Sequence, residues 1–197
     1  MQVRPYLLAV MLSCASLPSY AGADDADLPT LDPIEHPRVM RQTDKGSTST
    51  CIGRPETPIC AVEQVIGSRV RGDVKLWTLA VGNTKQPDDY FFKRKAHVAF
   101  AYYRVVGAQR LDDASIRRWF DAWAEMRCGE LIEASRFGDV RIDVQIEYNH
   151  NGKKEHRIER DSVPETYIVR KIGPRRWQVI DFCYPRIENE NDMYWLK

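Results

Sequence analysis

The sequence predicts an α+β fold, in which N-terminal helices pack on a C-terminal antiparallel sheet. Two observations carry this prediction. Apolar residues recur at helical spacing in the N-terminal part of the chain, and at every second position from Val140 onward. Asn151-Gly152 then supplies the residues of a tight hairpin turn. Helices first and strands later are typical of the α+β class.

Two capped helices open the folded region. Thr57 is the expected N-cap of the first, with Pro58 at its first helical position, and Gly72-Asp73 ends it. Asp73 then caps a short second helix that runs to Gly82. The apolar residues that define the two helices are Val62, Val65, Ile66, Val70, Val74, Trp77, Leu79, Ala80 and Val81.

Two further segments precede the sheet. Tyr90 to Val106 is rich in aromatic and apolar residues; its length favours a helix, although Tyr102 and Tyr103 would also suit a strand. Asp112 is expected to cap an amphipathic helix. The apolar face of that helix carries Ile116, Trp119, Phe120, Trp123 and Met126.

Four strands are expected in the C-terminal third. Val140 to Tyr148 alternates apolar and polar residues, as a half-buried antiparallel strand does. After the hairpin turn, Lys154 to Arg160 returns as a polar, exposed or edge strand. Thr166 to Ile172 and Trp177 to Tyr184 complete the sheet, with a turn at Gly173-Pro174 between them.

The first residues predict export. Arg4 precedes a short apolar run, and small residues before Gly22 give a cleavage site after Ala21, as in a secretory signal peptide. Residues 22–55 are rich in polar residues and proline, and are expected to form an extended or disordered leader. Residues 56–197 are then a single domain, and no second apolar stretch is long enough to span a membrane.

The charge balance and the cysteine content restrict the classes of function that the protein could have. Loss of Arg4 with the signal peptide leaves 28 basic and 28 acidic residues from the 29 and 28 of the whole chain. This balance argues against a nucleic-acid binder. The four remaining cysteines predict two disulfides in an oxidising compartment, with three pairings open. We favour Cys51–Cys60 and Cys128–Cys183; the spacings do not fit a zinc site, and no metal or cofactor is expected.

Cys14 raises a second processing route. A lipoprotein signal places a lipid-bearing cysteine after a small residue, and Ser13-Cys14 fits in part. Met11 and Leu12 do not match the residues usual before such a cysteine. Cleavage after Ala21 and a periplasmic product are therefore favoured over lipid anchoring.

The chain resembles the nuclear transport factor 2-like superfamily at both ends of its predicted domain. Pro58 to Val81, with the Gly72-Asp73 break, is similar to the opening helices of that superfamily. Tyr167 to Asp181, with Trp177 after the turn, is similar to its closing hairpin. The resemblance implies a curved sheet wrapped around helices in a cone that encloses a pocket. It implies no single activity, because some members are enzymes and many are binding domains.

The candidate catalytic residues are few. His97 could act as a general base if it were buried beside a carboxylate, and Asp143 and Glu147 could enter a pocket if their strand face were concave. The simpler interpretation is a packed or half-exposed histidine and a solvated strand face. There is no serine-nucleophile, phosphate-loop or zinc-protease motif.

The sequence therefore favours a non-catalytic exported binding protein over an enzyme. One concrete form is an immunity or inhibitor protein that neutralises a toxin or hydrolase in the bacterial envelope. The alternatives are a cone-fold isomerase, dehydratase or hydrolase, or a carrier, acting on a small apolar ligand. The residues expected to contact a partner protein are Arg141, Asp143, Glu147, Tyr194 and Trp195.

Overall fold

The fold is built on one five-stranded antiparallel sheet with helices against it, so the predicted α+β class is confirmed. The computed structural model describes residues 27–82, 85–87, 92, 98–117, 134–150, 158 and 163–183. The strands follow one another in the sheet in the order of the chain, β1-β2-β3-β4-β5. Their bounds are Arg38–Arg41 for β1, Phe100–Arg110 for β2, Val140–Asn149 for β3, Glu165–Gly173 for β4 and Arg176–Cys183 for β5.

Both predicted N-terminal helices form where their caps place them. α1 (Pro58–Arg71) begins after Thr57, whose hydroxyl accepts a hydrogen bond from the amide of Cys60 at 3.3 Å. It ends at Gly72, which adopts the left-handed conformation (φ 62°) that favours glycine. α2 (Val74–Val81) follows at once, because the carboxylate of Asp73 accepts from the amides of Lys75 and Leu76.

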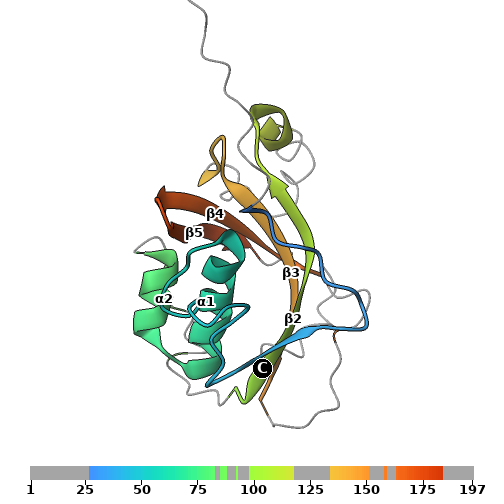
Figure 1. Ribbon diagram of the computed structural model, residues 1–197, viewed down its shortest axis with the longest axis vertical. Coiled ribbons are helices and arrows are strands. Elements are labelled where there is room, and N and C mark those ends of the chain that lie inside the picture. The colour runs from blue at the N-terminus through green and yellow to red at the C-terminus, as the bar shows by residue number, and fades with distance from the viewer. Residues whose placement is uncertain are drawn as a thin grey trace, which may run out of the picture.

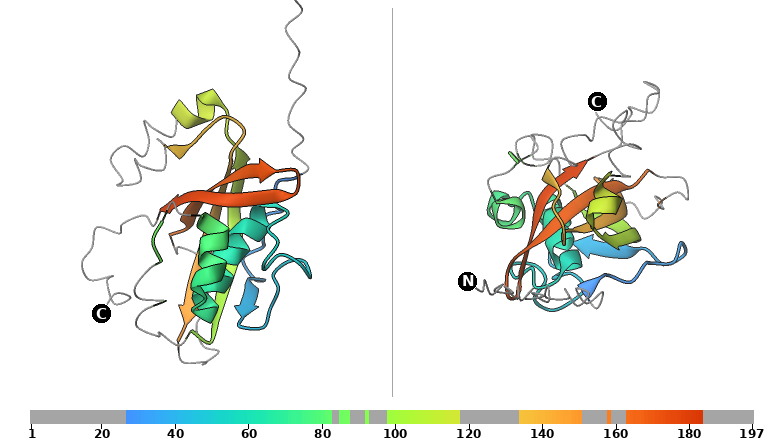
Figure 2. Two further views of the ribbon diagram at one scale, coloured as in Figure 1. Left: turned by 90° about the vertical axis from the view of Figure 1, so that its left-hand side faces the viewer. Right: turned by 90° about the horizontal axis from the view of Figure 1, so that it is seen from above.

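The sheet bends around α1. Figure 1 shows α1 and α2 against one face of the sheet, and Figure 2 shows the β4–β5 hairpin crossing over the same helices. α1 contacts every strand, and its residues from Pro58 to Val70 are all buried. No helix of the described residues is both long and apolar enough to cross a membrane.

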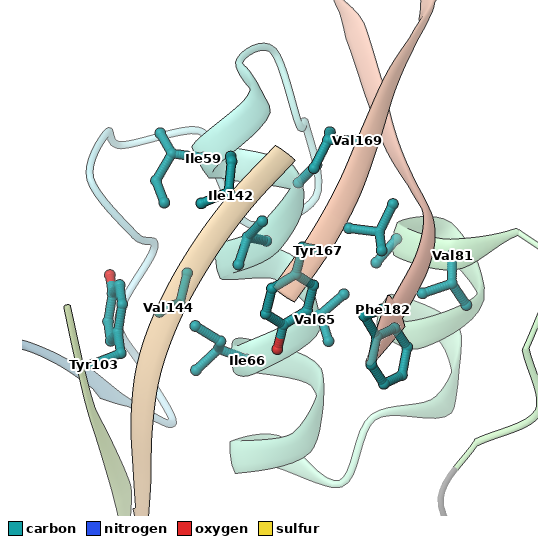
Figure 3. Close-up of a cluster of buried hydrophobic side chains, with 14 of the residues drawn as sticks. Ile59, Val65, Ile66, Val81, Tyr103, Ile142, Val144, Tyr167, Val169 and Phe182 are labelled. Carbon is teal, nitrogen blue, oxygen red and sulfur yellow. The ribbon is translucent and has the colours of Figure 1, made fainter. Parts of the chain in front are cut away.

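The hydrophobic core lies between α1 and the strands (Figure 3). Val65 and Ile66 of α1 are fully buried against the apolar face of the sheet. That face carries the apolar members of the alternating strand patterns, which include Tyr103, Val105, Ile142, Val144, Tyr167, Val169, Val179 and Phe182. Arg141, Asp143 and Thr166, which alternate with these residues, lie together on the opposite face of the sheet. Glu165 of β4 is an exception, because it shares the inner face with Tyr167 and bonds to Arg69.

Part of the segment expected to be a leader belongs to the sheet. β1 pairs with the first four residues of β2, with Arg38 opposite Tyr103 and Arg41 opposite Phe100. Met40, fully buried, is its one side chain in the core. Upstream, the amide of Asp32 donates to the carbonyl of Val105 at 2.8 Å, so the segment that precedes β1 also lies alongside β2. A single buried residue leaves no periodic signal, which is why the pattern missed the strand.

The ambiguous segment Tyr90 to Val106 resolves as a strand at its C-terminal end. β2 includes Tyr102 and Tyr103, whose aromatic and β-branched surroundings favour a pleated, half-buried surface. A bulge shifts the β2–β3 register between Val105 and Gly107. The helical expectation is therefore wrong from Phe100 onward, and His97 lies outside the described residues.

The later strands agree with the sequence to within one or two residues at their ends. Asp112 begins a helix as predicted: its carboxylate accepts from the amide of Ser115 at 2.6 Å, and helical residues follow to Arg117. The apolar face expected beyond Arg117, the Asn151-Gly152 turn and the strand over residues 154–160 lie outside the described residues, apart from Ile158.

The first of the two favoured disulfides is present. Cys51 and Cys60 are bonded, with their Cα atoms 4.7 Å apart, and both are buried. The bond fastens the loop after β1 to the first turn of α1. Cys183 at the end of β5 is also a disulfide cysteine. Its favoured partner, Cys128, lies outside the described residues, so that pairing stays a prediction.

Gly107→Ala should destabilise the fold by about 1–3 kcal/mol, the range for overpacking. A Cβ at this bulge would lie 2.6 Å from Asp143 Oδ2, and Asp143 is held in place through its other oxygen by Arg141 and Thr166. Gly173→Ala is the control, because its Cβ would meet only Arg176 at an ordinary 3.7 Å. Urea unfolding midpoints at equal slopes compare the two; equal shifts would contradict the close approach.

Candidate functional site

Two buried charged residues of α1 organise the polar interior. Glu63 and Arg69 are six residues apart, so they leave the helix in different directions. The side chains of both have no exposed surface. A buried charge is costly unless it is paired and hydrogen-bonded, so each should be surrounded by partners.

Arg69 lies against β3, β4 and α2. Its Nη1 donates to the hydroxyl of Tyr148 at 2.9 Å, to Glu165 Oε2 at 3.1 Å and to the hydroxyl of Tyr167 at 3.4 Å. Its guanidinium carbon lies 5.4 Å from the ring centroid of Trp77 and 5.1 Å from that of Phe182. We call Arg69, Tyr148, Glu165 and Tyr167 the Arg69 cluster.

Arg69 and Tyr167, two members of the Arg69 cluster, have raised pKa values and stay protonated. Burial by itself would lower the pKa of Arg69, but the facing oxygens of Tyr148, Glu165 and Tyr167 outweigh burial and raise that pKa well above its usual range. Burial, and then the negative charge of Glu165, raise the pKa of Tyr167 well above its usual range. Tyr167 therefore stays protonated and donates to Glu165. Neither group is suited to proton exchange near neutral pH.

Glu63 faces a different side of α1 from Arg69, toward β1, β2 and the loop after β1. Its carboxylate accepts from the amide of Ser47 at 2.7 Å, from the hydroxyl of Tyr103 at 2.7 Å and from Arg38 Nη1 at 3.2 Å, and the hydroxyl of Ser47 also donates to it. Arg38 also donates from Nε to Asp32 Oδ1 at 3.0 Å. Through these bonds one carboxylate joins α1, β1, β2 and the loop after β1.

A glycine makes room for this arrangement. Gly46 has φ 84°, and a Cβ there would lie 2.5 Å from Glu63 Oε2 and 2.7 Å from the Cβ of Cys51. The Cys51–Cys60 disulfide borders the same carboxylate, within 4.8 Å between ligand atoms. Because both sulfurs are bonded to each other and the carboxylate has four donors, this group does not fit a metal ion.

A hollow opens on the surface above Glu63. It has a volume of about 290 Å³, and we call it the β1 hollow. Tyr103 lies 2 % exposed at its base, whereas Lys45 and Ser47 are exposed. Its lining residues are Arg38, Val39, Asp44, Lys45, Gly46, Ser47 and Tyr103.

Of the residues expected to bind a partner, Arg141, Asp143 and Glu147 are described, and they lie on the sheet face away from α1. Arg141 Nε donates to Asp143 Oδ1 at 3.0 Å, and Thr166 donates to the same oxygen at 2.6 Å. Glu147 is half-buried opposite Tyr102. The structure does not turn Asp143 toward the interior, and Tyr194 and Trp195 lie outside the described residues.

Sequence reasoning missed the two buried networks. The only local signal is the pair of charges inside the apolar run of α1, where Glu63 follows Val62 and Arg69 precedes Val70. Their partners Tyr103, Tyr148, Glu165 and Tyr167 come from strands far along the chain, so their convergence requires the fold.

The comparisons with known proteins give no match: no protein-family model, no curated protein and no solved structure matches the chain. The function has to be argued from the geometry of the described residues.

Arg69→Met should destabilise the protein by about 3–5 kcal/mol, because it leaves Glu165 buried without its counter-charge. The double variant Arg69→Met/Glu165→Gln should be clearly more stable than the single one, since the amide is neutral and still accepts from Tyr167. Arg175→Met, at an 80 % exposed side chain paired with Glu56, is the control and should cost about half a kcal/mol or less. A double variant no better than the single one would assign the loss to packing.

Stability should fall above about pH 10, where tyrosine in an unfolded chain ionises. Burial and the charge of Glu63 raise the pKa of Tyr103 well above its usual range, so the folded state keeps a proton that the unfolded state has lost. Alkali therefore favours unfolding, by up to about 1.4 kcal/mol per pH unit for this one phenol. Tyr103→Phe should flatten the decline, measured by urea unfolding between about pH 8 and pH 11. An unchanged slope would refute the assignment.

Proposed function

We propose that the protein is a non-catalytic, exported binding protein of the periplasm, and that its partner is another protein. The observation that carries the proposal is the interior between α1 and the sheet, where the buried charges of Glu63 and Arg69 are each hydrogen-bonded to side chains of the fold. Its most concrete form is an immunity or inhibitor protein that neutralises a toxin or hydrolase in the envelope.

The filled interior supports binding at the surface rather than catalysis inside the fold. Trp77 and Trp177 are 1 % and 2 % exposed, and Tyr167 is fully buried. A substrate would have to reach Arg69 or Glu165 past these side chains, yet the side chain of Arg69 has no exposed surface. Catalysis needs a group within hydrogen-bond reach of a substrate, and a carrier needs an unfilled cavity.

The alternative of a cone-fold enzyme gains little support from the positions of its candidate residues. Asp143 is bonded to Arg141 and Thr166 on the face away from α1. The β1 hollow lies on the surface beside the edge strand, not beneath α1. We retain membership of the nuclear transport factor 2-like superfamily as part of the proposal, supported by α1 and α2 packed within the bend of the sheet.

Export is supported by the cysteines. The buried Cys51–Cys60 bond fixes the loop after β1, and such bonds persist in oxidising compartments. A disulfide in this position also stiffens a surface loop, which lowers the entropic cost of binding through it.

The test uses the product of the gene neighbouring this one, directed to the periplasm of a bacterial host. Co-expression of the full chain should restore colony growth, and the chain without Met1–Ala21 should not, because it stays in the wrong compartment. Purified residues 22–197 should form a complex with that product in gel filtration. The proposal is overturned if the full chain does not restore growth and no complex forms. Rescue by both forms of the chain would overturn the periplasmic site of action.

A further inference from the structure

We infer that the β1 hollow receives an extended, acidic segment of the partner protein, which bonds to the main chain of Val39 and places a carboxylate between Arg38 and Lys45. This inference rests on the proposed function, because it names the surface and the chemistry of the same interaction.

The main chain of Val39 faces outward. The amide of Arg41 donates to Asp44 Oδ2 at 2.9 Å and its carbonyl accepts from the amide of Asp44 at 3.1 Å, so neither group points to β2. In an antiparallel pair, hydrogen-bonded and non-bonded positions alternate. Val39 is two residues from Arg41 and opposite Tyr102, so its N–H and C=O also point away from β2, at the rim of the hollow.

The opening is only one residue wide. Pro37 precedes β1 and has no N–H, and the turn at Asp44 occupies the main chain of Arg41. An incoming strand can therefore form one pair of main-chain bonds, with Val39. This geometry prevents open-ended strand pairing, and it leaves specificity to the side chain that the partner directs into the hollow.

The hollow offers donors for a carboxylate. Arg38 uses Nε for Asp32 and Nη1 for Ser47 and Glu63, which leaves Nη2 on a side chain that is 26 % exposed. Lys45 is exposed and forms no ion pair within the part of the chain that the structure describes. A planar guanidinium edge beside an ammonium group is suited to a carboxylate. A second copy of this chain would present Arg38 and Arg41 instead, and like charges disfavour that pairing.

Hydrogen bonds within the protein already fix the loop after β1 that lines the hollow, without a bound partner. The amide of Ile52 donates to the carbonyl of Lys45 at 3.1 Å, and Arg71 donates to the carbonyl of Asp44. The amide of Ser47 is fixed on the buried carboxylate of Glu63. A loop held in this way loses little conformational freedom on binding.

The first test uses capped peptides that contain no terminal charge: acetyl-Thr-Val-Glu-Val-Thr-amide and its Gln and Lys counterparts. Titration of ¹⁵N-labelled residues 22–197 should shift the amide of Val39, and the Glu peptide should bind most tightly. Equal binding of the three peptides, or no shift at Val39, would overturn the inference whether or not growth rescue succeeds. The rescue experiment uses no peptide, so the two failures are distinguishable.

Single substitutions in the protein test whether Lys45 and the main chain of Val39 contact the peptide. Lys45→Gln should weaken the Glu peptide by about fivefold, the upper range for an exposed ion pair. Val39→Pro should weaken all three peptides by about fivefold, since it removes one outward N–H and leaves the β2 ladder unchanged. Lys171→Gln, at a half-exposed lysine of β4, is the control and should bind as the parent does. Melting temperatures identify a variant that has lost its fold. Folded variants that all bind like the parent would overturn the assignment.

Discussion

The enclosure of α1 is the constraint on which the rest of the structure depends. A helix buried on all sides that carries Glu63 and Arg69 must neutralise each charge where it lies. Glu63 accepts hydrogen bonds from Ser47 in the loop after β1 and from Tyr103 of β2. Arg69 donates to Tyr148 of β3 and to Glu165 of β4. A shift of α1 by one turn would leave both charges without partners, so the two networks fix its register against the sheet.

Elements specified by local chemistry could be predicted from the sequence. Thr57 and Asp73 bond to amides within three residues, and Cys51 and Cys60 are close in sequence, so each signal is contained in a short window. β1 could not be predicted, because it depends on pairing with β2 about sixty residues later and buries only Met40. β2 remained ambiguous because its aromatic residues satisfy a helical and a strand pattern equally well.

The candidate site was less predictable than the fold. The alternation of β3 assigned Asp143 to the polar side, but it could not show that Arg141 and Thr166 already bond to it. The β1 hollow depends on Gly46, whose missing side chain lets the loop lie against Glu63. A glycine in a polar segment has many explanations in a sequence, and only the nearby carboxylate identifies the one that applies.

The two edges of the sheet differ in how their main chain is covered. At β5, the amide of Trp177 donates to the carbonyl of Pro55 at 2.8 Å, and Gly82 lies against the side chain of Gln178, so the loops before α1 and after α2 cover that edge. At β1, Pro37 has no N–H and the Asp44 turn occupies the main chain of Arg41, so within β1 Val39 is the residue with both N–H and C=O directed outward, beside basic side chains and a rigid loop. Exposed strand edges favour aggregation, and both edges are protected against it. An opening limited to one residue keeps that protection, and it is the place on the sheet edge where the proposed partner segment could add its main-chain bonds.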